Sequence, residues 1–379
     1  MPGPGNSAKS YAYSDIKGPS VEEEIRFYEQ RCKERPTSWA DKVFLANAYL
    51  TKAQAEDNDE LFGKAEKLAT EVLKTRPEIK DAQLVLAHVS EGHHNFKGSY
   101  EICHKLYKQD PNDLALYSMI SNSLLEMGEV EEAGKWAKPL VERASSTGIL
   151  VHAARIAIYQ GEDDRAAKYL EAALKLEQPQ ERKSSARIRS LWGDIHLRHG
   201  RLKEARELLE VSLGIHKRSL PALLALARLE RREGKPDRAL QLLREAHAYF
   251  GNPAILTEMA LMEERLGNAE QARTLRKQAT DILREEVGSG LIGHARDLAK
   301  VLLDQGQHAE ALKVLQEEQK YRRDHRNFEL QAMAYEGLNK PKEGLMAMEK
   351  ALQHGYQDPA LFARAARIAA QAQDPRSGQ

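Results

Sequence analysis

Apolar residues recur at intervals of three and four along almost the whole chain from Ser20 onward, within stretches rich in Ala, Leu, Glu, Arg and Lys. This spacing places apolar side chains on one face of an α-helix. Alternation of apolar and polar residues, which would favour strands, is almost absent. The pattern therefore predicts helix after helix from residue 20. Residues 1–19, rich in Gly, Pro and Ser, are expected to be disordered or a linker.

The helices follow an internal repeat of 33 to 39 residues. An Ala recurs at this spacing six times, a Gly stands five residues before each Ala, and a small residue stands seven residues before each Gly. The six glycines are Gly128, Gly161, Gly200, Gly234, Gly267 and Gly306. A small residue lets two helices lie close together, and Gly ends the first helix because a left-handed backbone costs it little. Each unit is thus predicted to be a pair of packed helices.

This arrangement resembles the tetratricopeptide repeat (TPR), a unit of 34 residues whose two helices stack with those of its neighbours into a right-handed superhelix. Residues 191–205 and 225–239 match that pattern best. The resemblance implies an all-α fold, an α-solenoid of about nine repeats over residues 20–371 with capping helices, followed by a polar tail at 372–379. We expect the helix pairs at 37–77, 78–111, 112–146, 147–178, 183–217, 218–251, 252–284, 289–323 and 324–355, between an opening helix at 20–34 and a closing helix at 358–368.

Four places depart from the pattern. The first unit carries an insertion between its helices, around residues 52–59. The ninth unit has Asn339 where the turn Gly is expected and Gly344 where the Ala is expected. The connections around 177–183 and 285–290 are longer than the others. Such changes in length are typical of tolerated surface loops, and they also fit hinges or loops that contact a partner.

The charge balance excludes some classes of partner. The 379 residues include 57 Lys and Arg and 57 Asp and Glu, so the net charge is zero and nucleic acid or an anionic membrane is not expected as the main partner. No segment reaches the roughly 18 apolar residues that a membrane span needs. An apolar signal region is missing, which favours the cytoplasm, and an exported (periplasmic) protein without its leader is the alternative.

The resemblance also implies a binding surface, because the first helix of each TPR pair lines the inner, concave face. The residue after each small packing residue, with some residues one turn further along, forms the predicted partner-binding groove: Asn47, His88, Asn122, Arg155, Tyr159, Asp194, Arg198, Arg228, Arg231 and Lys300. The middle of this row is rich in arginine, which favours carboxylates or an acidic peptide as ligand. The alternative is that each Arg pairs with a neighbouring acid, such as Glu230, Glu233 or Glu264.

Catalytic and cofactor motifs are absent: there is no Gly-rich phosphate loop, His-Glu-x-x-His or Gly-x-Ser-x-Gly. We therefore expect no enzyme activity and no cofactor. His88, His93 and His94 could bind a transition metal, but they span a helix end and its turn and need not converge. The acidic-tail clamp of some TPR domains is not supported, because Val43 stands one turn before Asn47 where the clamp has Lys.

The sequence thus predicts a non-enzymatic scaffold or adaptor that binds a protein or peptide partner, with an acidic partner as one option, as a monomer or homodimer. Two alternatives stay open. One is an exported assembly or metal-associated factor, and the other is a regulatory or docking subunit of an enzyme complex.

Overall fold

The computed structural model describes residues 19–56, 58–144, 146–178, 181–290 and 292–373. Within these ranges the chain forms twenty α-helices and one short 3-10 helix. The expectations for residues 1–18 and 374–379 lie outside the described residues.

The helices alternate between an inner and an outer layer, between α1 (Val21–Glu34) and α20 (Pro359–Gln373). The inner helices are α2 (Trp39–Glu56), α4 (Lys80–Gly92), α6 (Leu114–Met127), α8 (Thr147–Tyr159), α10 (Arg182–Arg198), α12 (Leu220–Arg232), α14 (Pro253–Arg265), α16 (Ala295–Asp304) and α18 (His325–Gly337). The outer helices are α3 (Asp59–Thr75), α5 (Phe96–Gln109), α7 (Val130–Arg143), α9 (Asp163–Lys175), α11 (Leu202–Ile215), α13 (Pro236–Phe250), α15 (Ala269–Gly288), α17 (His308–Glu318) and α19 (Pro341–Gln353). These nine pairs confirm the predicted all-α solenoid.

Local chemistry explains where the helices begin and end. Ser20 caps α1 in a reciprocal capping box with Glu23, whose backbone N–H donates to the Ser20 hydroxyl at 3.2 Å. The six predicted turn glycines all have positive φ, from 74° to 89°. Asn339 adopts φ 55° in the ninth unit, so this departure in sequence preserves the turn, because Asn tolerates the left-handed region better than most residues.

Small residues allow the two layers to pack closely. The small residues expected to let the two helices of each unit lie close together are all buried: Ala46, Ala87, Ser121, Ala154, Gly193, Ala227, Ala260, Ala299 and Ala332. At Gly193 an added Cβ would lie only 2.8 Å from Cγ of Leu209 on the partner helix. The hydrophobic core is correspondingly a series of clusters between successive units.

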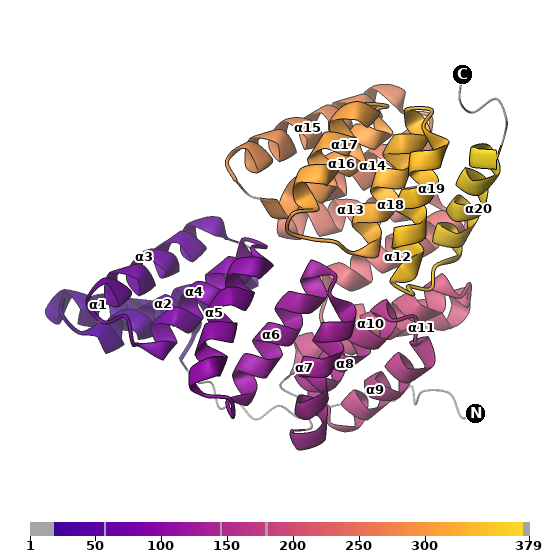
Figure 1. Ribbon diagram of the computed structural model, residues 1–379. Coiled ribbons are helices and arrows are strands. Elements are labelled where there is room, and N and C mark those ends of the chain that lie inside the picture. Colours follow the sequence, from indigo (N-terminus) through magenta and orange to yellow (C-terminus); the bar gives the residue numbers. More distant parts are fainter. Residues whose placement is uncertain (1–18, 57, 145, 179–180, 291, 374–379) are drawn as a thin grey trace.

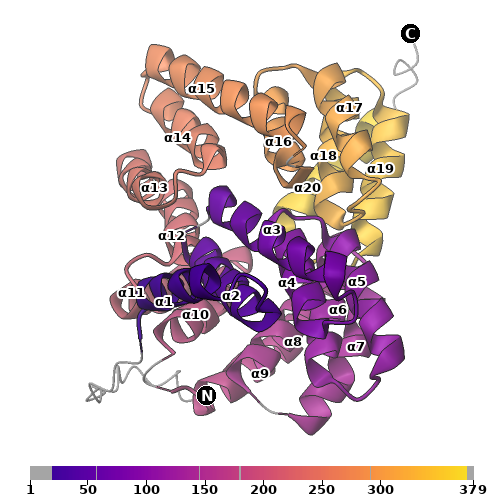
Figure 2. The same cartoon turned by 90° about the vertical axis from the view of Figure 1, so that its left-hand side faces the viewer.

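The solenoid folds back on itself. Helices α12–α20 form an arm that returns to the middle of the array (Figure 1), and α16–α20 lie over α4–α8 in the view turned by 90° (Figure 2). The backbone N–H of Arg323 donates to the carbonyl of Met127 at 2.8 Å, and Arg198 donates to the carbonyl of Gln357 at 2.6 Å. Units far apart in sequence are therefore in direct contact.

We call this contact region the seam. One side consists of the turns 93–95, 127–129 and 160–162 together with Arg198, and the other side of the connections 292–294, 319–325 and 354–358. Successive turns meet successive connections. The long connection expected at 285–290 is mostly helical, because α15 runs to Gly288, and Gly293 just after it packs against His94 of the seam. Residues 179–180 of the other long connection lie outside the described residues.

Candidate partner-binding surface

The inner polar row of the first half of the array forms a hydrogen-bonded ladder between units. Asn122 on α6 donates to Glu91 on α4 at 2.9 Å. Arg155 on α8 donates to the Asn122 side-chain oxygen at 3.3 Å and forms an ion pair with Glu126. Each contact joins neighbouring units, so these side chains hold the stack together.

The arginines further along continue the same scheme. Arg198 pairs with Asp163 at 2.9 Å, Arg228 with Asp194 at 2.8 Å, and Arg231 with Glu258 at 3.3 Å. In each pair the acid belongs to a neighbouring unit. The structure therefore shows the pairing that the second interpretation of the row expects.

The acids involved differ from the ones expected, however. Glu230 and Glu233 pair with Arg206 of α11, at 2.7 and 3.0 Å. Glu264 pairs with Arg276 of α15, at 2.6 Å. Ion pairs thus also run between inner and outer helices, and the acids nearest in sequence to the groove arginines are already used there.

The predicted groove residues differ widely in access to solvent. Three are exposed: Asn47, Arg228 and Lys300. Six are partly buried: His88, Asn122, Arg155, Tyr159, Asp194 and Arg231. Arg198 is buried in the seam, with 4% of its surface exposed. With the solenoid folded back on itself, which we call the closed form, a partner can reach only part of the predicted row.

An aromatic cluster closes the seam around Arg198. The ring of His325 stacks on Tyr356 with 4.2 Å between centroids and contacts Tyr159 at 5.5 Å. The Arg198 guanidinium lies over the Tyr356 ring at 5.0 Å, a cation–π contact. Burial lowers the pKa of His325 to about 3, so its imidazole is neutral at physiological pH. Tyr159 therefore contacts the chain's own C-terminal arm.

Two arginines that the sequence pattern did not single out also face this inner surface. Arg187 and Arg326 stand seven residues before the inner residues Asp194 and Met333, which places them two turns earlier on the same helix faces. Both side chains are exposed, and the described residues offer neither of them a carboxylate within ion-pair distance. Their spacing from the inner row was the signal that could have identified them.

The charges of these arginines and of Arg155 influence one another. Desolvation and the positive charge of Arg155 lower the pKa of Arg187, which still remains charged at neutral pH. Burial disfavours the charged form of Arg155, and Glu126 outweighs this and raises its pKa against the opposing charge of Arg326. Tyr159 is the main cause of the raised pKa of Arg326. The carboxylates of Asp324 and Asp194 also contribute to the raised pKa of Arg326, without forming an ion pair with it among the described residues.

The histidine group does not converge. His88 contacts Glu91 at 3.2 Å, His93 packs edge-on against Phe62 at 5.6 Å, and His94 lies against Phe96 and His294. Across the described ranges, no three His, Cys, Asp or Glu side chains gather as a metal-binding group.

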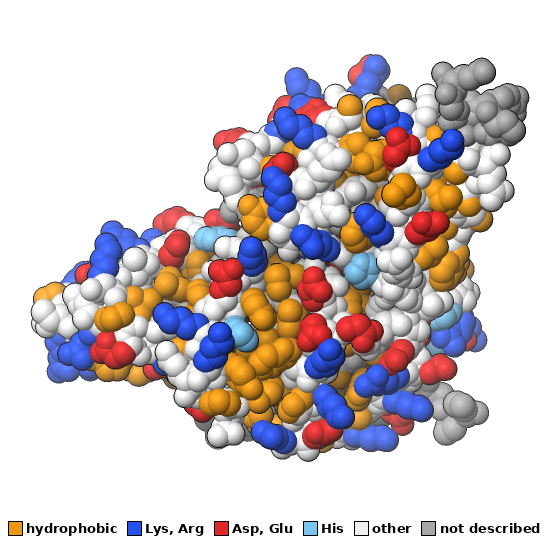
Figure 3. Space-filling view, viewed as in Figure 1, with side chains coloured by type: hydrophobic (Ala, Val, Ile, Leu, Met, Phe, Trp, Pro, Cys, Tyr) orange, Lys and Arg blue, Asp and Glu red, His pale blue; other side chains and the backbone are white. Residues whose placement is uncertain are grey.

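A further surface feature is aromatic. Hydrophobic side chains gather over α5–α7 on the face seen in Figure 3. There Trp136 contacts Tyr107 at 4.8 Å and Tyr117 at 5.2 Å, and all three rings are partly exposed. This cluster ties α5, α6 and α7 together.

Comparison with known proteins agrees with this architecture. A profile described as "Tetratricopeptide repeat" matches residues 152–219, which span α8 to α11. Residues 152–219 therefore contain tetratricopeptide repeats, and the helix pairs described on either side of them share the same architecture. TPR proteins serve in general as protein-interaction scaffolds and are generally non-catalytic. No helix among the described parts of the chain is long and apolar enough to cross a membrane.

Two solved structures are similar to this chain at low sequence identity. The APC/C hetero-tetramer Cut9–Hcn1 has a TM-score of 0.52 and 15% identity, over 92% of this chain and 67% of that chain. The human IFIT1 dimer with PPP-AAAA has a TM-score of 0.46 and 14% identity, over 89% of this chain and 96% of that chain. The first of these likenesses concerns the fold alone. No curated protein sequence matches the chain.

Proposed function

We propose that this protein is a non-enzymatic scaffold that binds an acidic segment of a protein partner on its inner face. The observation that carries the proposal is the pair Arg187 and Arg326, exposed beside Arg155 and without a carboxylate partner among the described residues. The neighbouring inner arginines are paired from unit to unit. Two free guanidinium groups in one concave region are therefore the strongest attraction for a partner's carboxylates.

The ladder limits where the acidic segment can bind. Arg155 and Arg198 already hold the carboxylates of Glu126 and Asp163, and displacing these partly buried acids would leave each of them with fewer partners, which is costly. Arg228, by contrast, is exposed and paired only with Asp194, so it can add a contact at the edge. The site thus consists of Arg187 and Arg326 at its centre and Arg228 at its rim.

A charge-reversal experiment tests the proposal. The double variant Arg187→Glu/Arg326→Glu should bind a fluorescently labelled decaglutamate peptide at least tenfold more weakly than wild type in an anisotropy titration at low salt, because charge-assisted hydrogen bonds contribute about 1.5–3 kcal/mol each. The matched control is Arg238→Glu/Arg273→Glu, which changes the net charge equally on outer helices α13 and α15.

The control separates a local site from bulk attraction. If the control weakens binding as much as the inner variant does, the peptide responds only to net charge and the proposal is wrong. Circular dichroism confirms that both double variants keep their helix content before titration.

A further inference from the structure

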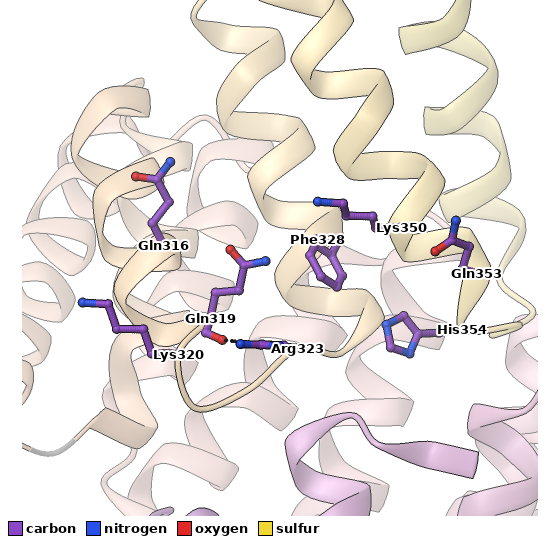
Figure 4. A pocket seen from close by; sticks show the side chains of 8 residues that line it. All are labelled: Gln316, Gln319, Lys320, Arg323, Phe328, Lys350, Gln353 and His354. Carbon is purple, nitrogen blue, oxygen red and sulfur yellow. Dashed lines mark hydrogen bonds between the residues drawn. The ribbon is translucent and has the colours of Figure 1, made fainter. Parts of the chain in front are cut away.

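A pocket of about 440 Å³ opens between the outer helices α17 and α19, over the first turn of α18 (Figure 4). It exists because α17 ends at Glu318 after eleven residues, whereas α13 and α15 have fifteen and twenty. The chain then passes through residues 319–324 toward the seam, where the Arg323 N–H bonds to Met127. A shortened outer helix thus leaves a gap beside its neighbour.

The pocket is positively charged. Lys320, Arg323 and Lys350 line it, and no Asp or Glu does. Among the described residues, Arg323 and Lys350 have no carboxylate within ion-pair distance. Arg323 donates to the Gln319 carbonyl at 3.3 Å, and the Lys350 ammonium lies 5.7 Å from the ring centroid of Phe328. Two uncompensated cations in a concave site raise the local concentration of anions.

Lys320 contributes less. It pairs with Glu317 at 2.5 Å, and both side chains are more than half exposed, so the pair is weak and easily exchanged. Its charge is therefore available only in competition with Glu317. Arg323 and Lys350 are the two groups that define the site.

The remaining lining suits a peptide. Phe328 and His354 form an aromatic wall with 6.0 Å between ring centroids, and burial lowers the pKa of His354, which keeps that wall neutral. Three glutamine side chains complete the lining, and each amide can donate and accept hydrogen bonds as a peptide group requires.

Helix orientation disfavours a compact multivalent anion. Both α17 and α19 end at this pocket, with Gln319 and His354 as their C-caps. The partial negative charge at a helix C-terminus opposes a doubly charged phosphate more than a single carboxylate. The glutamine amides and the two helix C-termini together favour an acidic peptide over a phosphate group.

We propose that this pocket binds an acidic peptide segment, with a carboxylate between Arg323 and Lys350, its aliphatic stem against Phe328 and its backbone on the glutamine amides. The site lies between outer helices, whereas the arginines of the proposed function face inward. It is therefore a second docking point, and each proposal can fail without the other.

Site-resolved lysine labelling tests this proposal with the full chain. Acetylation rates of individual lysines are measured by mass spectrometry with and without a hexaglutamate peptide. We expect the peptide to slow acetylation of Lys350 at least fivefold and to leave Lys342, an exposed lysine outside the pocket on the same helix, unchanged. Equal protection of both lysines, or none at Lys350, would overturn the proposal.

Matched variants give an independent readout. Both variants are made in the Arg187→Glu/Arg326→Glu background and titrated with labelled hexaglutamate by anisotropy. Lys350→Glu should weaken the remaining affinity at least tenfold. Lys342→Glu should change that affinity less than twofold. If the Arg187→Glu/Arg326→Glu variant by itself no longer binds hexaglutamate, the pocket proposal is wrong and the inner-face proposal is still supported. Protection of Lys350 by inorganic pyrophosphate but not by the peptide would show a small-oxyanion site and contradict the peptide proposal.

Discussion

Gly128 and Gly234 occupy the same place in their units, and both have a left-handed backbone, yet their surroundings differ. A Cβ added at Gly128 would lie 2.6 Å from the backbone nitrogen of Asp324, whereas one at Gly234 would meet no atom within 4 Å. The repeat places a left-handed residue at both turns, which glycine adopts most easily. Only the first turn carries a second requirement, because it lies in the seam. One repeated pattern therefore serves two tasks in different parts of the array.

The inner arginines show the same contrast. The Arg198 side chain is 3% exposed and bound to the C-terminal arm, whereas that of Arg228, one unit later, is 47% exposed. Arg198 is structural in this closed form, and Arg228 remains available to a partner. Equivalent positions in a repeat thus do not imply equivalent roles.

Replacing Arg198 should produce the largest loss of stability. Arg198→Met removes the pair with Asp163, which keeps only His199 at 2.7 Å, together with the bond to the Gln357 carbonyl and the contact with the Tyr356 ring, and should cost about 3–5 kcal/mol. Arg228→Met removes an exposed pair and should cost less than about 1 kcal/mol. Urea unfolding measures both variants, and similar losses would show that the seam does not bury Arg198.

Replacing the two turn glycines should cause losses of stability that differ by a smaller amount. Gly234→Ala should lower the free energy of unfolding by only about 1–2 kcal/mol, because alanine has to adopt the left-handed backbone. Gly128→Ala adds the clash with Asp324, worth about 1–3 kcal/mol more. Urea unfolding compares the two, and an equal loss in both variants would mean that the turn at Gly128 is as open as the turn at Gly234.

Acid should weaken the seam through His325. In the folded chain its pKa is lowered to about 3, below its ordinary value near 6.5. The unfolded chain therefore binds the proton first, and the stability of the fold decreases as the pH drops from about 6.5 to about 3. From pH 7 to 5 this group accounts for about 2 kcal/mol. The groups around it are Asp324, Arg326, Arg296, His354, Tyr159 and Tyr356.

The variant His325→Phe isolates this contribution. Neither ring nitrogen of His325 has a hydrogen-bond partner among the described residues, so Phe loses no such bond. Urea unfolding at pH 7 and pH 5 should show a smaller drop for the variant than for wild type, by about 2 kcal/mol. If the loss of stability between pH 7 and pH 5 is the same in the variant as in wild type, His325 is exposed to solvent and the seam is open.

The smallest effect concerns the ninth turn. Asn339→Gly should stabilise the chain by less than about 1 kcal/mol, because Gly adopts the observed positive φ more easily than Asn. Thermal unfolding measures the gain. A clear loss would mean that the Asn339 side chain has a role beyond the turn.

Much of the fold could be predicted because it rests on local rules. The period of apolar residues, the turn glycines and the buried small residues act within one unit, and Ala154 and Gly161 illustrate both requirements. The ion-pair ladder also has a signal in the sequence, because Asp194 stands 34 residues before Arg228, one repeat earlier. The acid that pairs with this inner arginine thus stands one repeat away and not beside it in sequence.

The seam could not be predicted in this way. The contact of Arg198 with Gln357 joins residues 159 positions apart, and the sum of small rotations between many units determines whether they meet. No local pattern reports that sum. The aromatic cluster of Tyr159, His325 and Tyr356 therefore had no signal in the sequence. Cellular location stays a prediction from sequence.

Amide-resolved hydrogen exchange of Arg323 tests the closure of the solenoid most directly, because its N–H bonds across the seam to Met127. We predict that this amide exchanges at least a hundredfold more slowly than an unstructured one in wild type, and loses that protection in Gly128→Val. Lys235, bonded within its own unit to Glu230, should stay protected in both. Fast exchange of Arg323 in wild type beside a protected Lys235 would contradict the closed solenoid.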